Sequence, residues 1–112
     1  MDLENNDLTP FQRSVLELTK KIPSGKVATY KLLAKVLGNE KLSRAVGNAL
    51  NRNPFPIVVP CHRVIKSDGF IGGFAKGTEA KIKLLIKENV LINKSNKIDL
   101  RKYLVDEAIL KE

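Results

Sequence analysis

Cysteine and histidine are nearly absent from this chain, which has one of each among its 112 residues and no tryptophan. A single cysteine cannot close an internal disulfide, so the composition indicates a reducing, intracellular setting, and we expect a cytoplasmic protein. One cysteine and one histidine also fall short of the ligand set of a zinc site. We therefore expect no metal ion and no other cofactor.

Long apolar segments are absent as well. No apolar run approaches the roughly 20 residues that a membrane-spanning helix needs. The first residues, MDLENNDLTPF, are too acidic and polar for a secretory signal, so we expect no membrane association. The length suits one domain with one small core, and a hydrophobic content of 43% is ordinary for a globular protein.

Positive charge is abundant. Lysine and arginine total 20 against 12 acidic residues, a formal net charge of +8. Nucleic acid is the commonest partner of such a surface, and a solvated lysine-rich face without a partner is the alternative.

Three helices are predicted in the first half of the chain. TPFQ at 9–12 has the pattern of a capping box with proline in the first turn, and apolar residues then recur at helical spacing as far as Ile22. PSG at 23–25 ends this helix, and residues 27–28 are a candidate short strand. A second helix is predicted from Thr29 to Gly38, and a third covers residues 42–52.

The arrangement of the second and third helices, joined by a tight glycine-containing turn, is typical of a helix-turn-helix. The apolar run 57–59 is predicted as a strand or buried extended segment. Residues 63–65 and 70–71 flank KSDG, which predicts a hairpin turn, and a final helix is predicted over 78–88. The expected fold is mainly α with a small β-hairpin, that is, a winged helix-turn-helix DNA-binding domain.

The third predicted helix carries Arg44, Gly47 and Asn51 on the face opposite its apolar residues. An exposed glycine inside a helix costs about 0.5–1 kcal/mol relative to alanine, which calls for a reason. Close approach of a DNA backbone is one reason, and packing between helices is the other. A lone exposed arginine is usually just solvated, but beside a helix-turn-helix it is a candidate duplex contact.

The cysteine and the histidine stand side by side as Cys61 and His62. In an extended segment neighbouring side chains point to opposite faces, so a direct thiol–imidazole contact is awkward and a bridging water is favoured. Since the chain has no second histidine, the sequence argues against a cysteine hydrolase. A small buried cysteine and a buried neutral histidine with only structural roles remain the alternative.

The motif PCHRV at 60–64, preceded by RAVGNALNRNP at 44–54 and followed by a glycine-rich loop, resembles the O6-alkylguanine-DNA alkyltransferase family, the methylated-DNA–protein-cysteine methyltransferases. The similarity runs from about Thr9 to Asn89 and corresponds to the C-terminal winged-helix domain of the family. We expect an alkyltransferase domain over 9–89 and a C-terminal extension over 90–112, in which we expect a small hairpin and a helical turn. The N-terminal domain usual in the family is not expected here.

The resemblance implies a chemistry in which Cys61 takes an alkyl group from guanine O6 in one irreversible step. His62 would take the thiol proton through water, and Glu88 would orient His62 and stabilise its cation. Asn53 would tie the helix end to the cysteine loop, although an ordinary helix C-cap is its plain alternative. Tyr30 would donate a hydrogen bond to the base ring, unless it is simply a surface tyrosine.

The resemblance also implies a lesion flipped out of the duplex, with Arg44 in the vacated space and the third helix in the minor groove. The remaining positions are implied less specifically. The implied backbone contacts are Gly47, Asn51, Lys31, Asn39 and Ser67, and the implied base pocket is Leu50, Val64, Phe74 and Ala75. Phe74 stands where many members of the family have tyrosine, so a polar contact near the alkyl group is expected to be missing.

The expected partner is double-stranded DNA containing O6-alkylguanine, and we expect a monomer. Two other functions stay open. One is a non-catalytic, alkyltransferase-like damage-binding protein, although such proteins usually replace the cysteine, often with tryptophan. The other is a winged-helix transcription regulator, which would need Arg44 but neither Cys61 nor Glu88.

Overall fold

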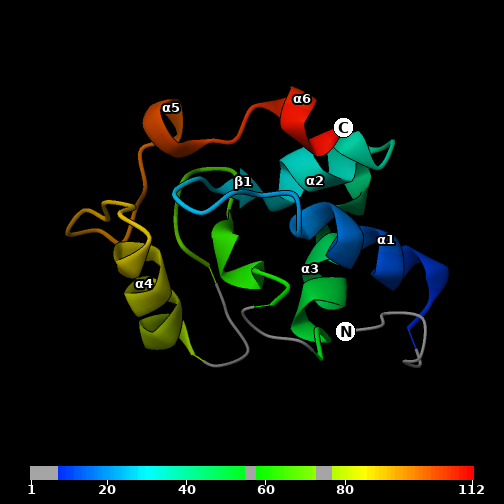
Figure 1. The fold of residues 1–112 in the computed structure, drawn as a ribbon, viewed down its shortest axis with the longest axis horizontal. Coiled ribbons are helices and arrows are strands. Elements are labelled where there is room, and N and C mark those ends of the chain that lie inside the picture. The colour runs from blue at the N-terminus through cyan, green and yellow to red at the C-terminus, as the bar shows by residue number, and fades with distance from the viewer. Residues whose placement is uncertain (1–7, 55–57, 73–76) are drawn as a thin grey trace.

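A computed structural model describes residues 8–54, 58–72 and 77–112 of the chain (Figure 1). Within these ranges no helix is long and apolar enough to cross a membrane. The α-helices are α1 (Pro10–Thr19), α2 (Tyr30–Val36), α3 (Ser43–Asn51), α4 (Thr78–Lys87), α5 (Leu100–Tyr103) and α6 (Glu107–Leu110). Two 3-10 helices, η2 (Glu40–Leu42) and η3 (Cys61–Arg63), and two strands, β1 (Ala28–Thr29) and β2 (Val64–Ile65), complete the described elements.

Helix α1 begins as its sequence predicts. The Thr9 side chain accepts a hydrogen bond from the Gln12 amide at 3.1 Å, and the Gln12 side chain accepts one from the Thr9 amide at 3.0 Å. This reciprocal capping satisfies two amides that a helix start would otherwise leave unpaired. Val15 and Leu18 are buried in the helix and Ile22 just beyond it, which confirms most of the predicted apolar stripe.

Helices α2 and α3 form the predicted helix-turn-helix. The Thr29 side chain caps α2 by accepting the Leu32 amide at 3.0 Å. The chain leaves α2 through Gly38, whose φ of +116° lies in the region that favours glycine. Helix η2 and α3 then follow directly, and α3 buries Val46 and Leu50 on its inner face.

The strands pair differently from the predicted hairpin. β1 and β2 form a parallel pair with Ala28 opposite Val64, and α2 and α3 make the crossover between them. The predicted turn does exist, because the Lys66 amide donates to the Phe70 carbonyl at 2.9 Å. No ladder continues beyond it in the described residues, where β2 pairs with β1 and Phe70 pairs with Lys97 of the C-terminal extension.

Other predicted segments are partly wrong. Residues 61–63 form a 3-10 turn instead of an extended segment, because the Arg63 amide donates to the Pro60 carbonyl at 2.9 Å. Of the predicted buried run 57–59, residue 57 lies outside the described residues, Val58 is 61% exposed and Val59 is buried. In α4, Ile86 is 57% exposed although the pattern placed it with the apolar residues.

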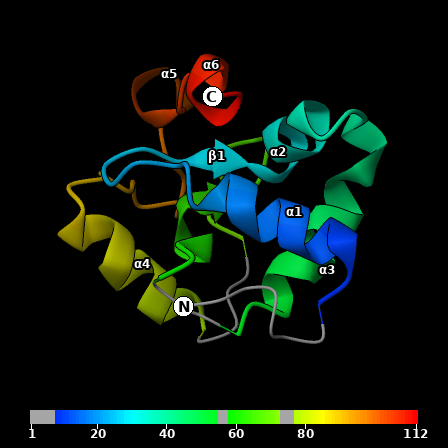
Figure 2. The same ribbon diagram turned by 45° about the vertical axis from the view of Figure 1, so that its right-hand side comes forward.

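The C-terminal extension, residues 90–112, lies along the side of β1 that faces away from α3 in both Figure 1 and Figure 2. Val27 donates to the Tyr103 carbonyl at 2.9 Å and accepts from the Val105 amide at 2.8 Å, which adds a further parallel bridge beside β1. The expected small hairpin is limited to a turn at 93–97, where the Asn93 amide donates to the Lys97 carbonyl at 3.0 Å.

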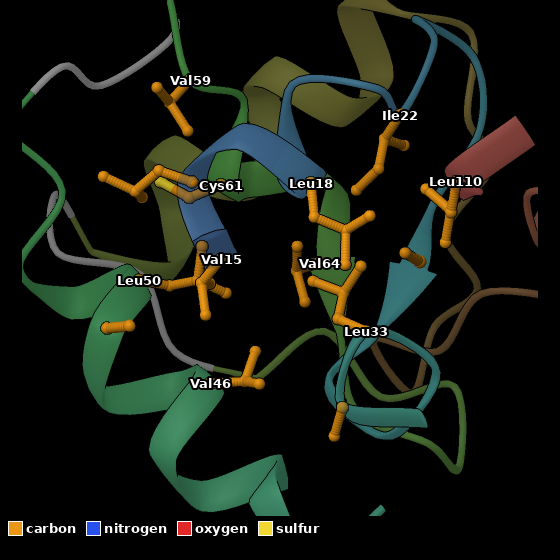
Figure 3. Packing of buried hydrophobic residues seen from close by; sticks show 14 of the residues in the cluster. Val15, Leu18, Ile22, Leu33, Val46, Leu50, Val59, Cys61, Val64 and Leu110 are labelled. Atoms are coloured by element: carbon orange, nitrogen blue, oxygen red, sulfur yellow. The ribbon is translucent and has the colours of Figure 1, made fainter. Parts of the chain in front are cut away.

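Two clusters of buried apolar side chains form the core. The larger one joins α1, α2, α3 and β2, and includes Cys61 at its edge next to Val59 and Leu50 (Figure 3). The smaller one collects Val27, which precedes β1, with side chains of β2, α4 and the extension: Ile65, Leu85, Ile98 and Tyr103. Val105 and Leu110 of the extension belong to the larger cluster, so the extension contributes to both.

Candidate active site and DNA-facing surface

Cys61 is the first residue of η3, and its side chain is only 8% exposed. The turn begins at Pro60, and the Cys61 amide donates to the Val59 carbonyl at 2.8 Å, which folds the chain back tightly. The side-chain nitrogen Nδ2 of Asn53 donates to Cys61 Sγ at 3.5 Å and to the Val59 carbonyl at 3.1 Å. Asn53, at the end of α3, therefore contacts both the sulfur and the backbone of the turn that presents it.

His62 follows in the same turn and is 1% exposed. Its Nε2 lies 3.2 Å from Oε2 of Glu88, the residue that ends α4. Burial lowers the pKa of His62 below its ordinary value of 6.5 and outweighs the hydrogen bond and charge of Glu88, which act to raise it. A buried imidazole of this kind is neutral near pH 7 and can accept a proton.

Arg63 is a residue of the site that the sequence reasoning gave no role. Its Nε donates to Glu88 Oε1 at 2.9 Å and its second terminal nitrogen donates to Glu88 Oε2, so the pair is bidentate. Its remaining nitrogen donates to the Ile22 carbonyl at 2.7 Å. Burial alone would raise the pKa of Glu88, but the hydrogen bonds from Arg63 and His62 outweigh it, and the pKa of Glu88 is lowered.

Lys81 is a second residue that sequence reasoning missed. It is completely buried in α4, and its Nζ donates to the Val64 carbonyl at 2.7 Å and lies 6.0 Å from the centre of the Tyr30 ring. Burial lowers the pKa of Lys81 from 10.5 to about 8, and a thiolate at Cys61 offsets this effect in part. The signal was present, because Lys81, Leu85 and Glu88 lie at i, i+4 and i+7 on one helix face.

Tyr30, the first residue of α2, lies between the cysteine turn and the surface. Burial raises the pKa of the Tyr30 phenol, and a thiolate at Cys61 adds to this effect. Its ring would lie 3.9 Å from a Cβ added at Gly47, which is ordinary van der Waals contact. Crowding within the described part of the chain therefore does not explain the glycine at position 47.

A surface hollow of about 500 Å³ gathers most of the predicted DNA-contact positions. It lies between the start of α2, the outer face of α3 and the turn after β2. Its lining includes Tyr30, Lys31, Arg44, Gly47, Asn51, Lys66 and Ser67. Arginine and lysine side chains around a concave surface suit the phosphate backbone of a nucleic acid.

Not every predicted position lines this hollow. Asn39 instead caps η2, where its side chain accepts the Lys41 amide at 2.9 Å. Leu50 is buried in the core beside Cys61, and the Val64 carbonyl already accepts the Lys81 ammonium. Phe74 and Ala75 lie outside the described residues.

Comparison with known proteins gives this arrangement a context. The family model described as the 6-O-methylguanine DNA methyltransferase DNA-binding domain matches residues 10–90. A methylated-DNA–protein-cysteine methyltransferase of Methanosarcina acetivorans is 53% identical over 77 residues, which are 69% of this chain and 49% of that protein. The chain spans about half the length of the curated relatives it matches.

Solved structures extend the similarity beyond residue 90. The OGT of Mycobacterium tuberculosis, crystallised in complex with DNA, aligns with 94% of this chain and 58% of its own at a TM-score of 0.71 and 33% identity. Atl1 of S. pombe, crystallised with damaged DNA containing O6-carboxymethylguanine, aligns with 95% of this chain and 99% of its own at a TM-score of 0.76 and 30% identity. These neighbours confirm the predicted fold class.

Proposed function

Since the chain belongs to the 6-O-methylguanine DNA methyltransferase family by the match to its DNA-binding domain, we propose that it repairs DNA by moving an alkyl group from guanine O6 to Cys61. The observation that carries this proposal is the set of contacts made by the turn that presents the cysteine. Asn53 donates to the sulfur, and the next residue, His62, contacts Glu88, which also pairs with Arg63. A cysteine with only a packing role would need none of these partners.

Activation of the thiol begins with His62. A thiolate is the reactive form of cysteine, so the thiol proton needs an acceptor. His62 is neutral near pH 7 because burial lowers its pKa. Once protonated, the imidazolium gains from the ionised Glu88 3.2 Å away. In this role Glu88 acts through His62 and is a positioning residue.

Arg63 keeps Glu88 ionised and in place. The guanidinium contacts both carboxylate oxygens and is itself held by the Ile22 carbonyl. Fixing the carboxylate in this way fixes the acceptor that faces His62. The charges also balance. Before proton transfer, the positive charge of Arg63 and the negative charge of Glu88 cancel, and proton transfer then adds one imidazolium and one thiolate.

The transfer itself forms a sulfur–carbon bond as the carbon–O6 bond breaks. The electron pair of the broken bond stays on the guanine, and the proton given to His62 balances the proton that the guanine regains. Tyr30, whose raised pKa keeps it a phenol, is the donor we assign to the base ring. The product is a thioether without a good leaving group, so each molecule reacts once.

Access to the reacting atom requires that the base leave the duplex, since a stacked and paired base cannot reach the thiol of Cys61. The hollow beside Tyr30 brings together Arg44, Lys31 and Asn51, which suits a duplex backbone on one side and an extruded base on the other. By the family resemblance, Arg44 fills the vacated space. DNA in the crystals of the M. tuberculosis and S. pombe neighbours supports this partner.

Damage binding without transfer is the second candidate function. It is favoured by the whole-length match to Atl1, of which this chain covers 99%. The presence of Cys61 with its hydrogen-bond partners favours transfer instead. The two candidates agree on the DNA partner and differ only in whether Cys61 gains a group. We expect the chain to act as a monomer in a reducing compartment, where its free thiol persists.

Intact-mass measurement tests the reaction directly. We expect the protein incubated with a duplex containing O6-methylguanine to gain one methyl group on the peptide that carries Cys61. The Cys61→Ser variant, which keeps nearly the same side-chain size, is expected to bind the duplex and gain nothing. Transfer by Cys61→Ser would overturn the assignment of the nucleophile. Tight lesion binding by an unmodified wild type would favour the damage-binding function.

A further inference from the structure

The turn that follows β2, residues 66–69, is held by the C-terminal extension; we call it the wing turn. It projects beside the hollow, and its Lys66 and Ser67 line that hollow together with Arg44 and Asn51. Internally it is closed by short-range hydrogen bonds, from the Gly69 amide to the Lys66 carbonyl, from the Lys66 amide to the Phe70 carbonyl and from the Phe70 amide to the Asp68 side chain. In the described residues the chain after the turn pairs with the C-terminal extension and not with β2.

Its partner is the segment 96–98. The Ile98 amide donates to the Gly69 carbonyl at 2.9 Å, the Ile71 amide donates to the Asn96 carbonyl at 3.1 Å, and Phe70 forms an antiparallel bridge with Lys97. Ile71 and Ile98 are both 2% exposed and share the smaller core cluster. The contact therefore combines backbone pairing with burial of apolar side chains.

Gly69 shows how closely the two segments approach. Its φ is +93°, and an added Cβ would lie 2.8 Å from the Ile98 carbonyl oxygen, a distance that requires the backbone to move. The same Cβ would lie 3.2 Å from Cγ of Lys97. A side chain at position 69 would thus push the extension away from the wing turn.

The segment 96–98 is fixed from both ends. Before it, the Asn93 side chain accepts the amides of Ser95 and Lys97 at 2.9 and 3.0 Å, which shapes the turn leading into it. After it, the extension pairs with Val27 through Tyr103 and Val105, and Leu110 enters the larger core cluster. A segment held at both ends can serve as a rigid support.

The pairing also places a cation. The Lys97 ammonium lies 5.3 Å from the centre of the Phe70 ring, and the Lys97 side chain is exposed. Lys97 lines a second hollow together with Asp68 of the wing turn, while Lys66 lines the hollow that contains Arg44. Exposed lysines at the turn and on its supporting segment suit the phosphates of a duplex.

We propose that the C-terminal extension braces the wing turn for contact with the DNA backbone, and that Lys97 contributes a phosphate contact beside the lesion-binding hollow. The proposal rests on the proposed function for its DNA partner. It extends that function, because the extension lies beyond residues 10–90, where the family match ends.

Duplex binding tests the Lys97 contact independently of alkyl transfer. Anisotropy titrations of a labelled duplex with the full chain over a salt series would compare Lys97→Ala with Lys94→Ala, an exposed lysine in the preceding turn. Loss of one phosphate contact should weaken binding about fivefold at 0.15 M salt and reduce the slope of log K against log salt by about 0.9. We expect this of Lys97→Ala and no change for Lys94→Ala. Equal behaviour of the two variants would overturn the contact.

The brace is tested at the glycines. Gly69→Ala should release segment 96–98, remove hydrogen-exchange protection from the Ile71 and Ile98 amides, and weaken duplex binding roughly thirtyfold if Lys66 and Lys97 both lose their phosphates. Gly25→Ala is the matched control, since its φ is +91° but its Cβ would meet a backbone oxygen at 3.6 Å.

A less disruptive variant covers the case in which Gly69→Ala does not fold. Asn93→Ala removes the acceptor for two amides of the supporting turn and should weaken duplex binding in the same direction. Loss of Ile98 protection with unchanged duplex binding would overturn the brace. Rates of reaction with free O6-benzylguanine separate the two proposals. If Lys97 contacts only the DNA backbone, Lys97→Ala should react with free O6-benzylguanine at the wild-type rate. A wild-type protein that reacts neither with this free base nor with the O6-methylguanine duplex would contradict the proposed transfer and leave the brace unaffected.

Discussion

Glu88 accepts hydrogen bonds from two side chains, so one carboxylate affects both the folding stability of the site and the protonation of His62. Arg63 contacts both carboxylate oxygens, and His62 lies 3.2 Å from one of them. The carboxylate is 16% exposed, so water screens it only in part. Removing Glu88 would leave a half-buried guanidinium without its partner as well as removing the support of His62. Its effects on folding and on reaction would therefore have to be measured separately.

The buried Lys81 predicts a distinct pH dependence of stability. Its pKa is about 8 in the folded protein against 10.5 in the unfolded chain. Between these two values the unfolded chain binds more protons, so this residue makes the folded state more stable as the pH rises. Relative to a Lys81→Met variant, the free energy of unfolding of the wild type should rise by about 2 kcal/mol from pH 7 to 9.5.

Urea unfolding followed by circular dichroism at several pH values would measure this difference. Lys83→Met, on the exposed face of the same helix, is the control and should give a difference from wild type that is nearly independent of pH. A constant difference for Lys81→Met over the same range would contradict the lowered pKa.

At the residue scale, the sequence pointed to the residues around the cysteine but not to the charged side chains that contact them. Cys61 and His62 stood out because they are single occurrences in a rare motif, and the family resemblance added Asn53 and Glu88. The structure pairs Asn53 with Cys61 and His62 with Glu88, and the turn η3 carries one member of each pair. Lys81 was missed because a lysine in a helix is usually solvent-exposed. Its place on the face shared with Leu85 and Glu88 was the available signal.

At the scale of the elements, the start of α1 offers a direct test of capping. Thr9→Ala removes the side chain that accepts the Gln12 amide, and should lower the free energy of unfolding by about 1 kcal/mol. Ser14→Ala, in the same helix, removes a hydroxyl that bonds the Pro10 carbonyl and serves no cap. Chemical denaturation of both variants should show a clear loss only for Thr9→Ala, and equal losses would contradict the role of the capping box.

Local signals explain which elements were predictable. The caps at Thr9 and Thr29 and the stop at Gly38 act within a few residues, so the sequence predicts these boundaries closely, whereas α1 ends at Thr19, before the predicted end at Ile22. The strands are different, because β2 has two residues and its partner lies 36 positions earlier. The KSDG turn indicates a hairpin by local rules, but the chain before the turn pairs with β1 and the chain after it pairs with segment 96–98. Such non-local pairings leave little trace in a short sequence.

At the scale of the whole molecule, the C-terminal extension joins the two core clusters. Ile98 and Tyr103 belong to one cluster and Val105 and Leu110 to the other. We therefore expect the extension to unfold together with the helix-turn-helix in one transition. The division of the chain into a domain over 9–89 and an extension over 90–112 stays a prediction.

Leu110→Ala tests this cooperativity. Leu110 is 1% exposed, so its truncation should lower the global free energy of unfolding by about 2–5 kcal/mol without changing the denaturant slope. Leu91→Ala, at a leucine of the same extension that is 68% exposed, should stay within about 0.5 kcal/mol of wild type. A separate early transition in Leu110→Ala, with the main transition unmoved, would contradict a single cooperative unit.

The parallel pairing around Val27 has a consequence for the order in which the protein folds. Ala28 and Thr29 pair with Val64–Ile65, and Val27 itself pairs with Tyr103 and Val105. Both sets of partners lie far from Val27 in the sequence, so this small sheet forms only after distant parts of the chain have come together. The cysteine turn adjoins β2, so a partly folded molecule would hold its sulfur in an unfinished scaffold. Competence for the proposed transfer should therefore appear late in refolding, together with the completed sheet.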